Sequence, residues 1–295
     1  MVSGIIWDVI NWALGMQMNY KCGVDGTYPV LPIILPMLLL IAQCLYDLKT
    51  GEKVPFDTLI ERIVGSKARV VYLGEVHTSR EIHDFQMRVI RALYERDSNL
   101  TIAYEMFQQP AQEYLDEYVE GKIHEVVMLY KARWHETWKY DIGLYRQTWT
   151  FAKEKGIPML ATNVPDNFRK RAKRMSYERM RKTPYLPPDL QEPDSAYIEQ
   201  FKRMMGGHAH FDQKTLNTFL KAMIVWDEGM AYAIARYLKR EPHRRVVMLV
   251  GSGHVYNRLG IPNRVERMTG DRGIVVIPIN NLKEDLGKGD FGVCW

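Results

Sequence analysis

Four side chains that can move protons or bind a metal directly follow short apolar runs in this sequence. Gly74-Glu75-Val76-His77 follows one run, Glu105 ends a second, and Gly251-Ser252-Gly253-His254 follows a third. Carboxylates and imidazoles in one place suit general acid–base catalysis or metal binding. Both uses stay open. The four groups are candidate catalytic residues, and His77, Glu105 and His254 are candidate ligands of a divalent metal.

The elements that must position these groups are five apolar runs separated by helical patterns. The runs are residues 69–74, 100–105, 157–162, 245–251 and 273–279. Short apolar strands alternating with helices predict an α/β fold, with a mostly parallel β-sheet flanked by helices. Ligands of such sheets bind beyond the carboxyl ends of the strands. We therefore expect all four groups at one sheet edge, together with Asn163, which follows the third run.

A long stretch without a strand pattern separates the third and fourth runs. Residues 168–239 predict a helical insert before the last strands. Asp227 interrupts the apolar stripe of its final helix, and a carboxylate there needs a partner. We expect Asp227 to face the polar site, which His83 can also join from the first helix after Glu75.

Three further features each have a structural and a functional interpretation. His208 and His210 lie in Gly206-Gly207-His208-Ala209-His210, which is either an exposed loop or a contact for a metal, an anion or haem. Residues 169–174 are basic, which indicates a solvated helix face or attraction to an anionic surface. The aromatic set comprises Tyr130, Trp134, Trp138, Tyr140, Tyr145 and Trp149. Those rings fit core packing or the wall of a flat ligand such as a porphyrin.

The first 46 residues differ from the rest of the chain in composition. Residues 29–46 are almost wholly apolar, too short for a typical membrane-spanning helix and interrupted by prolines. They are typical of an export signal. Ile41-Ala42-Gln43-Cys44 resembles a lipobox that would lipidate Cys44, although Gln43 departs from it. We divide the chain into a signal, lipoprotein or membrane-anchor segment (1–46) and an α/β domain (47–295). We expect the protein to be located in the bacterial cell envelope, either anchored to a membrane or free in the periplasm.

Several function classes are disfavoured. The net charge of +5 is mild for a nucleic-acid-binding protein. The three cysteines form no CxxC pair. No GxxxxGK[ST] loop, GxGxxG after the first strand, HExxH or GxSxG is present, which argues against nucleotide binding and serine hydrolysis.

An ordered series of short motifs resembles the ChaN-like family of haem-binding uptake lipoproteins. The motifs are residues 46–51, 74–77, 105–107, 110–112, 133–138, 144–146, 206–210, 226–231 and 251–254. The resemblance implies an envelope protein that binds haem through a tyrosine, with basic or histidine side chains at the propionates, and haem-linked homodimerisation. Tyr145, in Leu144-Tyr145-Arg146, is our choice of iron ligand, with Tyr130 and Tyr140 as rivals. His208 and His210 are the candidate propionate or iron contacts.

The same sheet edge is similar to that of a broader superfamily with erythromycin-esterase-like hydrolases and metal-dependent proteases of the TIKI and TraB type. Glu75, His77, Glu105 and His254 match positions that carry chemistry there. Haem binding in iron or haem uptake is therefore the first hypothesis. A hydrolase, metal-dependent or not, is the alternative.

Overall fold

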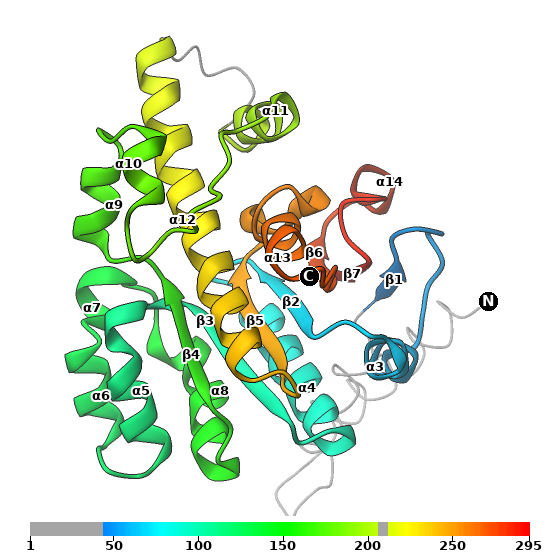
Figure 1. Ribbon diagram of the computed structural model, residues 1–295. Coiled ribbons are helices and arrows are strands. Elements are labelled where there is room, and N and C mark those ends of the chain that lie inside the picture. The colour runs from blue at the N-terminus through cyan, green and yellow to red at the C-terminus, as the bar shows by residue number, and fades with distance from the viewer. Residues whose placement is uncertain (1–43, 206–211) are drawn as a thin grey trace, which may run out of the picture. The chain divides into compact units, whose positions relative to one another are not determined.

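One mixed sheet organises the domain in this computed structural model, which describes residues 44–205 and 212–295 (Figure 1). The strands of the described residues run in the order β1-β7-β6-β2-β5-β3-β4, parallel throughout except for β1 against β7. They are β1 Leu45–Asp47, β2 Val70–Glu75, β3 Leu100–Gln108, β4 Met159–Asn163, β5 Arg245–Gly251, β6 Ile274–Ile279 and β7 Phe291–Cys294. The predicted α/β fold is confirmed, with β1 and β7 added at one edge.

Helices cover both faces of the sheet because both sides of its central strands are apolar. Val71 and Leu73 of β2 face one apolar cluster, while Val70 and Tyr72 face the other. The first face carries α3 Phe56–Gly65, α4 Arg80–Arg96, α5 Gln112–Val119, α6 Glu125–Lys131, α7 Trp134–Thr137 and α8 Ile142–Lys155. The second carries α12 Gln213–Arg240 and α13 Ile261–Thr269. In Figure 1, α12 crosses in front of the central strands and α4 lies behind them.

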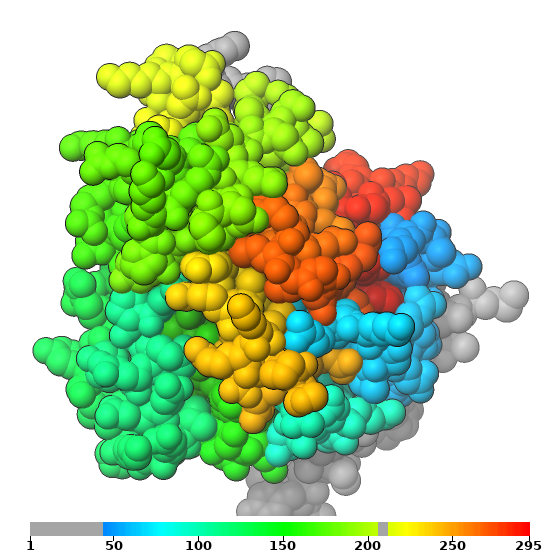
Figure 2. All heavy atoms as spheres, in the orientation of Figure 1, coloured from blue at the N-terminus to red at the C-terminus, as the bar shows by residue number. Residues whose placement is uncertain are grey.

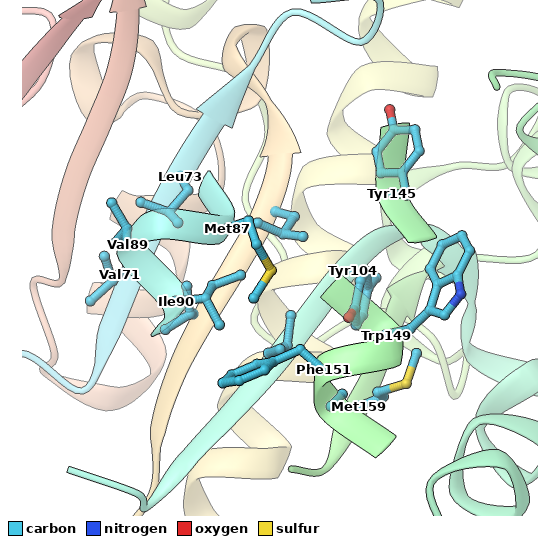
Figure 3. Close-up of a cluster of buried hydrophobic side chains, with 14 of the residues drawn as sticks. Val71, Leu73, Met87, Val89, Ile90, Tyr104, Tyr145, Trp149, Phe151 and Met159 are labelled. Atoms are coloured by element: carbon cyan, nitrogen blue, oxygen red, sulfur yellow. The ribbon is translucent and has the colours of Figure 1, made fainter. Parts of the chain in front are cut away.

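The apolar core between α4 and α8 extends to Tyr145, which borders the predicted polar site. Met87, Val89 and Ile90 of α4 meet Trp149 and Phe151 of α8 in one buried cluster (Figure 3). Burial of each large apolar side chain contributes about 1.5–3 kcal/mol. Tyr145 lies at one end of this cluster, and Figure 3 shows its hydroxyl turned away from the apolar side chains. Helix α8 therefore carries both core residues and the polar hydroxyl of Tyr145.

The predicted helical insert forms a subregion of its own. It comprises α9 Asp166–Ala172, α10 Tyr177–Arg181, α11 Ser195–Met204 and α12. Phe168 and Met180 pack with Val225 of α12, and Tyr197 and Phe201 pack with Ile224. The remaining described elements are the short η1 Gln109–Ala111, η2 Ser252–His254, η3 Tyr256–Arg258 and α14 Leu282–Asp285. The shorter helices of the insert therefore pack against α12 through two apolar clusters.

The start of the domain differs slightly from the prediction. β1 begins at Leu45, so two residues assigned to the leading segment pair with β7 in the sheet. The predicted export segment otherwise lies outside the described residues, apart from Cys44. Within residues 44–205 and 212–295, no helix is long and apolar enough to cross a membrane.

The close approach of α12 to the end of β4 gives a stability prediction. A Cβ atom added at Gly229 would lie 2.1 Å from Cγ1 of Val164, so the Val164 side chain or the α12 backbone would have to move. We expect Gly229→Ala to lower the free energy of unfolding by about 2 kcal/mol, as overpacking does. Urea denaturation followed by circular dichroism measures this.

Gly65, the last residue of α3, is the matched control. A Cβ atom there would meet nothing within 4 Å. Gly65→Ala should therefore stabilise the fold by about 0.5 kcal/mol through the unfolded chain. Equal effects of the two substitutions would contradict the close packing of Gly229.

Candidate functional site

The predicted polar groups converge where four adjacent parallel strands end. Glu75 ends β2, Glu105 lies in β3, Asn163 ends β4, and His254 lies in η2 directly after β5. The Gly251 amide donates to Oε2 of Glu105 at 2.6 Å, and Asn163 Nδ2 donates to the Glu105 carbonyl at 3.0 Å. The convergence is confirmed; the catalytic roles assigned to these residues stay predictions.

The first of two hydrogen-bonded chains runs from Tyr145 through Glu75 to His77. The Tyr145 hydroxyl donates to Oε1 of Glu75 at 2.8 Å, and the same oxygen lies 2.7 Å from Nδ1 of His77. Buried His83 lies 3.8 Å from the other Glu75 oxygen, as expected of a supporting residue. Glu75 thus orients His77, whose Nε2 makes no hydrogen bond to a described residue.

The second chain runs from Tyr197 through Asp227 and His254 to Glu105. Tyr197 donates to Oδ2 of Asp227 at 2.6 Å, and Oδ1 of Asp227 lies 2.5 Å from Nδ1 of His254. The other ring nitrogen, Nε2, lies 3.3 Å from Oε1 of Glu105. The prediction that Asp227 faces the polar site is confirmed. Figure 2 shows α11, which carries Tyr197, beside α13 on this face of the molecule.

Tyr197 is the member that sequence reasoning missed. It lies in an amphipathic helix between apolar neighbours, where a tyrosine is indistinguishable from a core residue. It shares a buried cluster with Phe201 and Leu220. Only the partner of its hydroxyl, 30 positions away, reveals its polar role.

The carboxylates determine how the two histidines titrate. Burial alone would lower the pKa of His254, but Glu105 and Asp227 raise it to about 10. Burial likewise opposes charge on His77, yet the hydrogen bond that His77 donates to Glu75 and the charge of Glu105 raise its pKa above the ordinary value. Burial would raise the pKa of Glu105, whereas His254 and His77 hold it below its ordinary value. At neutral pH, His254 is therefore an imidazolium between two carboxylates.

Gly251 lets the two chains meet. A Cβ atom at this position would lie 2.9 Å from Cε1 of His77 and 3.4 Å from Oε2 of Glu105. A side chain would therefore displace the His77 imidazole. Because residue 251 is a glycine, His77 can lie against its backbone, and the amide of that same residue donates to Glu105.

Aromatic side chains form the rim of this site. The rings of Trp138 and Tyr140 each lie 4.9 Å from that of His77, and Trp226 lies 5.9 Å from His254. Trp134, Tyr145 and Trp149 are instead buried in the core. The aromatic segment thus splits into core residues and a rim over a polar floor.

The predicted divalent metal is not supported. Among residues 44–205 and 212–295, no group of three or more His, Cys, Asp or Glu side chains is arranged to hold a metal ion. The physical reason is the pairing within the site. Both nitrogens of His254 face carboxylates, and Nδ1 of His77 faces Glu75. Most of the nitrogen and oxygen atoms that would bind a metal in His77, Glu105 and His254 are therefore already paired within the site.

The remaining predicted site residues differ in exposure. His208 and His210 lie outside the described residues. Tyr130 is 81% exposed on α6, Tyr140 is 36% exposed at the rim, and Tyr145 is fully buried.

A cavity of about 480 Å³, lined by residues that include Asp47, lies at the opposite end of the sheet, where β2 and β6 begin.

The pairing of His254 gives a pH prediction. Asp227→Asn keeps the shape of the side chain and removes one of the two flanking charges. We expect the His254 pKa to fall from about 10 toward 6.5, and the fold to lose about 3 kcal/mol at neutral pH because a buried pair is broken. Nitrogen NMR of the imidazole and urea denaturation measure the two effects.

The sign of the pH dependence follows from linkage. The pKa of folded His254 lies above its unfolded value, so this stabilisation is complete below pH 6.5 and is lost as the pH rises through about 10. Asp227→Asn should flatten that decline. Asp189→Asn, which removes a carboxylate paired with Arg267 at 3.2 Å, is the control and should leave the His254 pKa unchanged. Titration of wild-type His254 near 6.5 would contradict the assigned pairing.

One solved structure that is similar to this chain has the same fold. The structure reported as cofacial heme binding to ChaN of Campylobacter jejuni matches with a TM-score of 0.69 and 18% sequence identity, covering 85% of this chain and 96% of that one. An erythromycin esterase mutant in its open conformation matches with a TM-score of 0.48 and 12% identity, covering 85% and 81% of the two chains. No match was found among curated protein sequences.

A family model supplies the assignment. The model described as haem-binding uptake, Tiki superfamily, ChaN matches residues 64–265. This match includes β2 to β5 and the whole helical insert. It spans well over half of the 295 residues, and the chain therefore belongs to the ChaN family of haem-binding uptake proteins in the Tiki superfamily.

Proposed function

We propose that this protein binds haem as the cargo of an uptake system, at the aromatic rim of the strand-end site. The observation that carries the proposal is the wall that Trp138 and Tyr140 form against His77, each ring 4.9 Å from the imidazole. Haem requires a flat apolar surface with a few polar groups beside it, and this rim borders a polar floor. Family membership supports the same ligand.

Tyr140 is the tyrosine best placed to bind iron. The ligand predicted from the resemblance, Tyr145, is fully buried and donates a hydrogen bond to Glu75. Burial and the Glu75 charge raise the pKa of Tyr145 far above its ordinary value, which opposes the phenolate that iron binds. Tyr140 is 36% exposed and already contacts His77. We therefore assign iron binding to Tyr140 and the support of Glu75 to Tyr145.

Cations for the haem carboxylates are available next to the rim. The Arg169 guanidinium lies 4.2 Å from the ring centre of Trp226, which in turn packs against His254. Arg169 also pairs with Asp166 at 2.8 Å, so a propionate would share this cation. His208 and His210 remain candidates from the sequence.

We also propose an extracytoplasmic location in the bacterial envelope, which the uptake family supports. The export segment, membrane anchor and haem-linked homodimer stay predictions. Sizing of the protein with and without hemin tests the dimer, and mass spectrometry of the mature N-terminus tests the segment.

Hemin titration tests the proposed ligand. Purified wild-type protein should show a saturable Soret shift at micromolar hemin and a charge-transfer band from tyrosinate ligation. Tyr140→Phe should abolish this band, because it removes the phenolate and little else. Tyr145→Phe and Tyr130→Phe should retain it. Absence of a saturable shift in the wild type would reject haem binding.

The same titration decides between the tyrosines. Tyr94→Phe, a change in the core beside Phe151, is the control for nonspecific effects. Loss of the band in Tyr145→Phe alone, with a native circular dichroism spectrum, would return iron binding to Tyr145 and reject Tyr140.

A second candidate function is hydrolysis without a metal. The observation that favours it is the orientation of His77, held at Nδ1 by Glu75 and without a hydrogen-bonding partner among the described residues at Nε2. An imidazole in this arrangement is suited to take a proton from water. His254, fixed as an imidazolium, would stabilise negative charge nearby and leave Glu105 ionised.

An ester screen tests this candidate through its pH profile. Since the neutral imidazole is the base, activity should rise with pH through the raised pKa of His77, above 6.5. His77→Gln should lower the rate at least about 100-fold. Glu105→Gln removes a charge that raises this pKa, so its rising limb should move to lower pH. Wild-type activity equal to that of His77→Gln would eliminate hydrolysis.

A further inference from the structure

Cys44 and Cys294 face each other across the pair of strands at one edge of the sheet. In the antiparallel register of β1 and β7, Leu45 is opposite Val293, so the next pair outward is Cys44 and Cys294. The Cys294 amide donates to the Cys44 carbonyl at 2.8 Å. Residues opposed in this way have Cα atoms about 5.5 Å apart. That separation lies within the range of about 4.4–6.8 Å that a disulfide spans.

The two side chains also point to the same side of the strand pair. The Cys44 side chain raises the pKa of both the Cys294 thiol and the Tyr46 hydroxyl, as expected of close neighbours on one side of the strands. Both cysteines are reduced and only partly buried, so a small oxidant in solution can reach them. Opposed Cα atoms, adjacent sulfurs and solvent access are the geometric conditions for disulfide formation.

We propose that Cys44 and Cys294 form a reversible disulfide that fastens β1 to β7 and, while it exists, prevents acylation of Cys44. Among the described strands, β1 pairs with β7 alone, through three residues. The bond closes a ring around nearly the whole described domain. It competes directly with the lipidation that the sequence motif predicts, because one thiol cannot serve both.

A small disulfide such as oxidised glutathione is a sufficient oxidant. The Cys44 thiolate attacks one of its sulfurs and releases the first glutathione thiolate. Cys294 then gives its proton to solvent and attacks the Cys44 sulfur of the mixed disulfide, which releases the second glutathione. The protein loses two protons and two electrons, and the oxidant becomes two thiols. Burial and the neighbouring Cys44 raise the pKa of the Cys294 thiol to about 11, so the second step should accelerate as the pH rises.

Peptide mapping of the full chain tests the bond. Cys22→Ser removes the third cysteine and leaves one thiol in the tryptic peptide of residues 22–49 and one in that of residues 289–295. The reduced protein is exposed to oxidised glutathione, alkylated and digested. We expect the two peptides joined, with the loss of two hydrogen atoms. Cys22→Ser combined with Cys294→Ser is the matched control and should give no joined peptide.

Thermal unfolding gives an independent readout. Oxidation of the Cys22→Ser protein should raise Tm by about 10 °C, because a very long loop is closed, whereas the double variant should show no change. Separate alkylation of both thiols after prolonged oxidation would overturn the proposal. So would a persistent glutathione adduct on Cys44 beside an alkylated Cys294, or a Cys44 that carries an acyl chain in the isolated protein. Haem binding plays no part in these measurements, so its failure leaves this result unaffected.

Discussion

The need to satisfy buried charge at one end of the sheet determines the arrangement of the polar site. Glu105 lies in the middle of the sheet, away from water, and an ionised carboxylate there is stable only with donors around it. The Gly251 amide and the His254 imidazolium supply those donors. His254 in turn requires Asp227, which the long helix α12 brings from the insert. The helical insert is therefore part of the polar site and not an addition beside it.

The two hydrogen-bonded chains begin alike and differ in accessibility. Each runs from a tyrosine through a carboxylate to a histidine, but His254 continues to a second carboxylate, Glu105, and so is occupied at both nitrogens, whereas His77 is occupied at one. Trp138 and Tyr140 pack against the His77 ring. Under the two proposed functions, haem on those rings and a substrate at His77 would therefore compete for the same imidazole.

The sequence predicts the parts of the structure whose signal is local or topological. The five central strands are continuous apolar runs, and parallel pairing brings their carboxyl ends together, so Glu75, Glu105 and His254 could be placed in advance. β1 and β7 are only three and four residues long. They are recognisable as strands because they pair with each other, and no local sequence pattern reveals that pairing. The metal hypothesis failed for a related reason. Residue types indicate which side chains could bind a metal. They do not indicate whether those side chains are already paired with one another, as His254 is with Glu105 and Asp227.

The long sequence separations within the site have a consequence for folding. The bond between Gly251 and Glu105 joins residues 146 positions apart, and that from Ser252 to the Glu75 carbonyl spans 177. Contacts of this range form slowly, because the entropy of closing the intervening chain must first be overcome. The polar cluster can therefore be completed only after β5 has inserted between β2 and β3. A chain that placed β5 in the wrong order or register would leave Glu105 buried without its amide, so the same charges that serve the site also select against misfolded sheets.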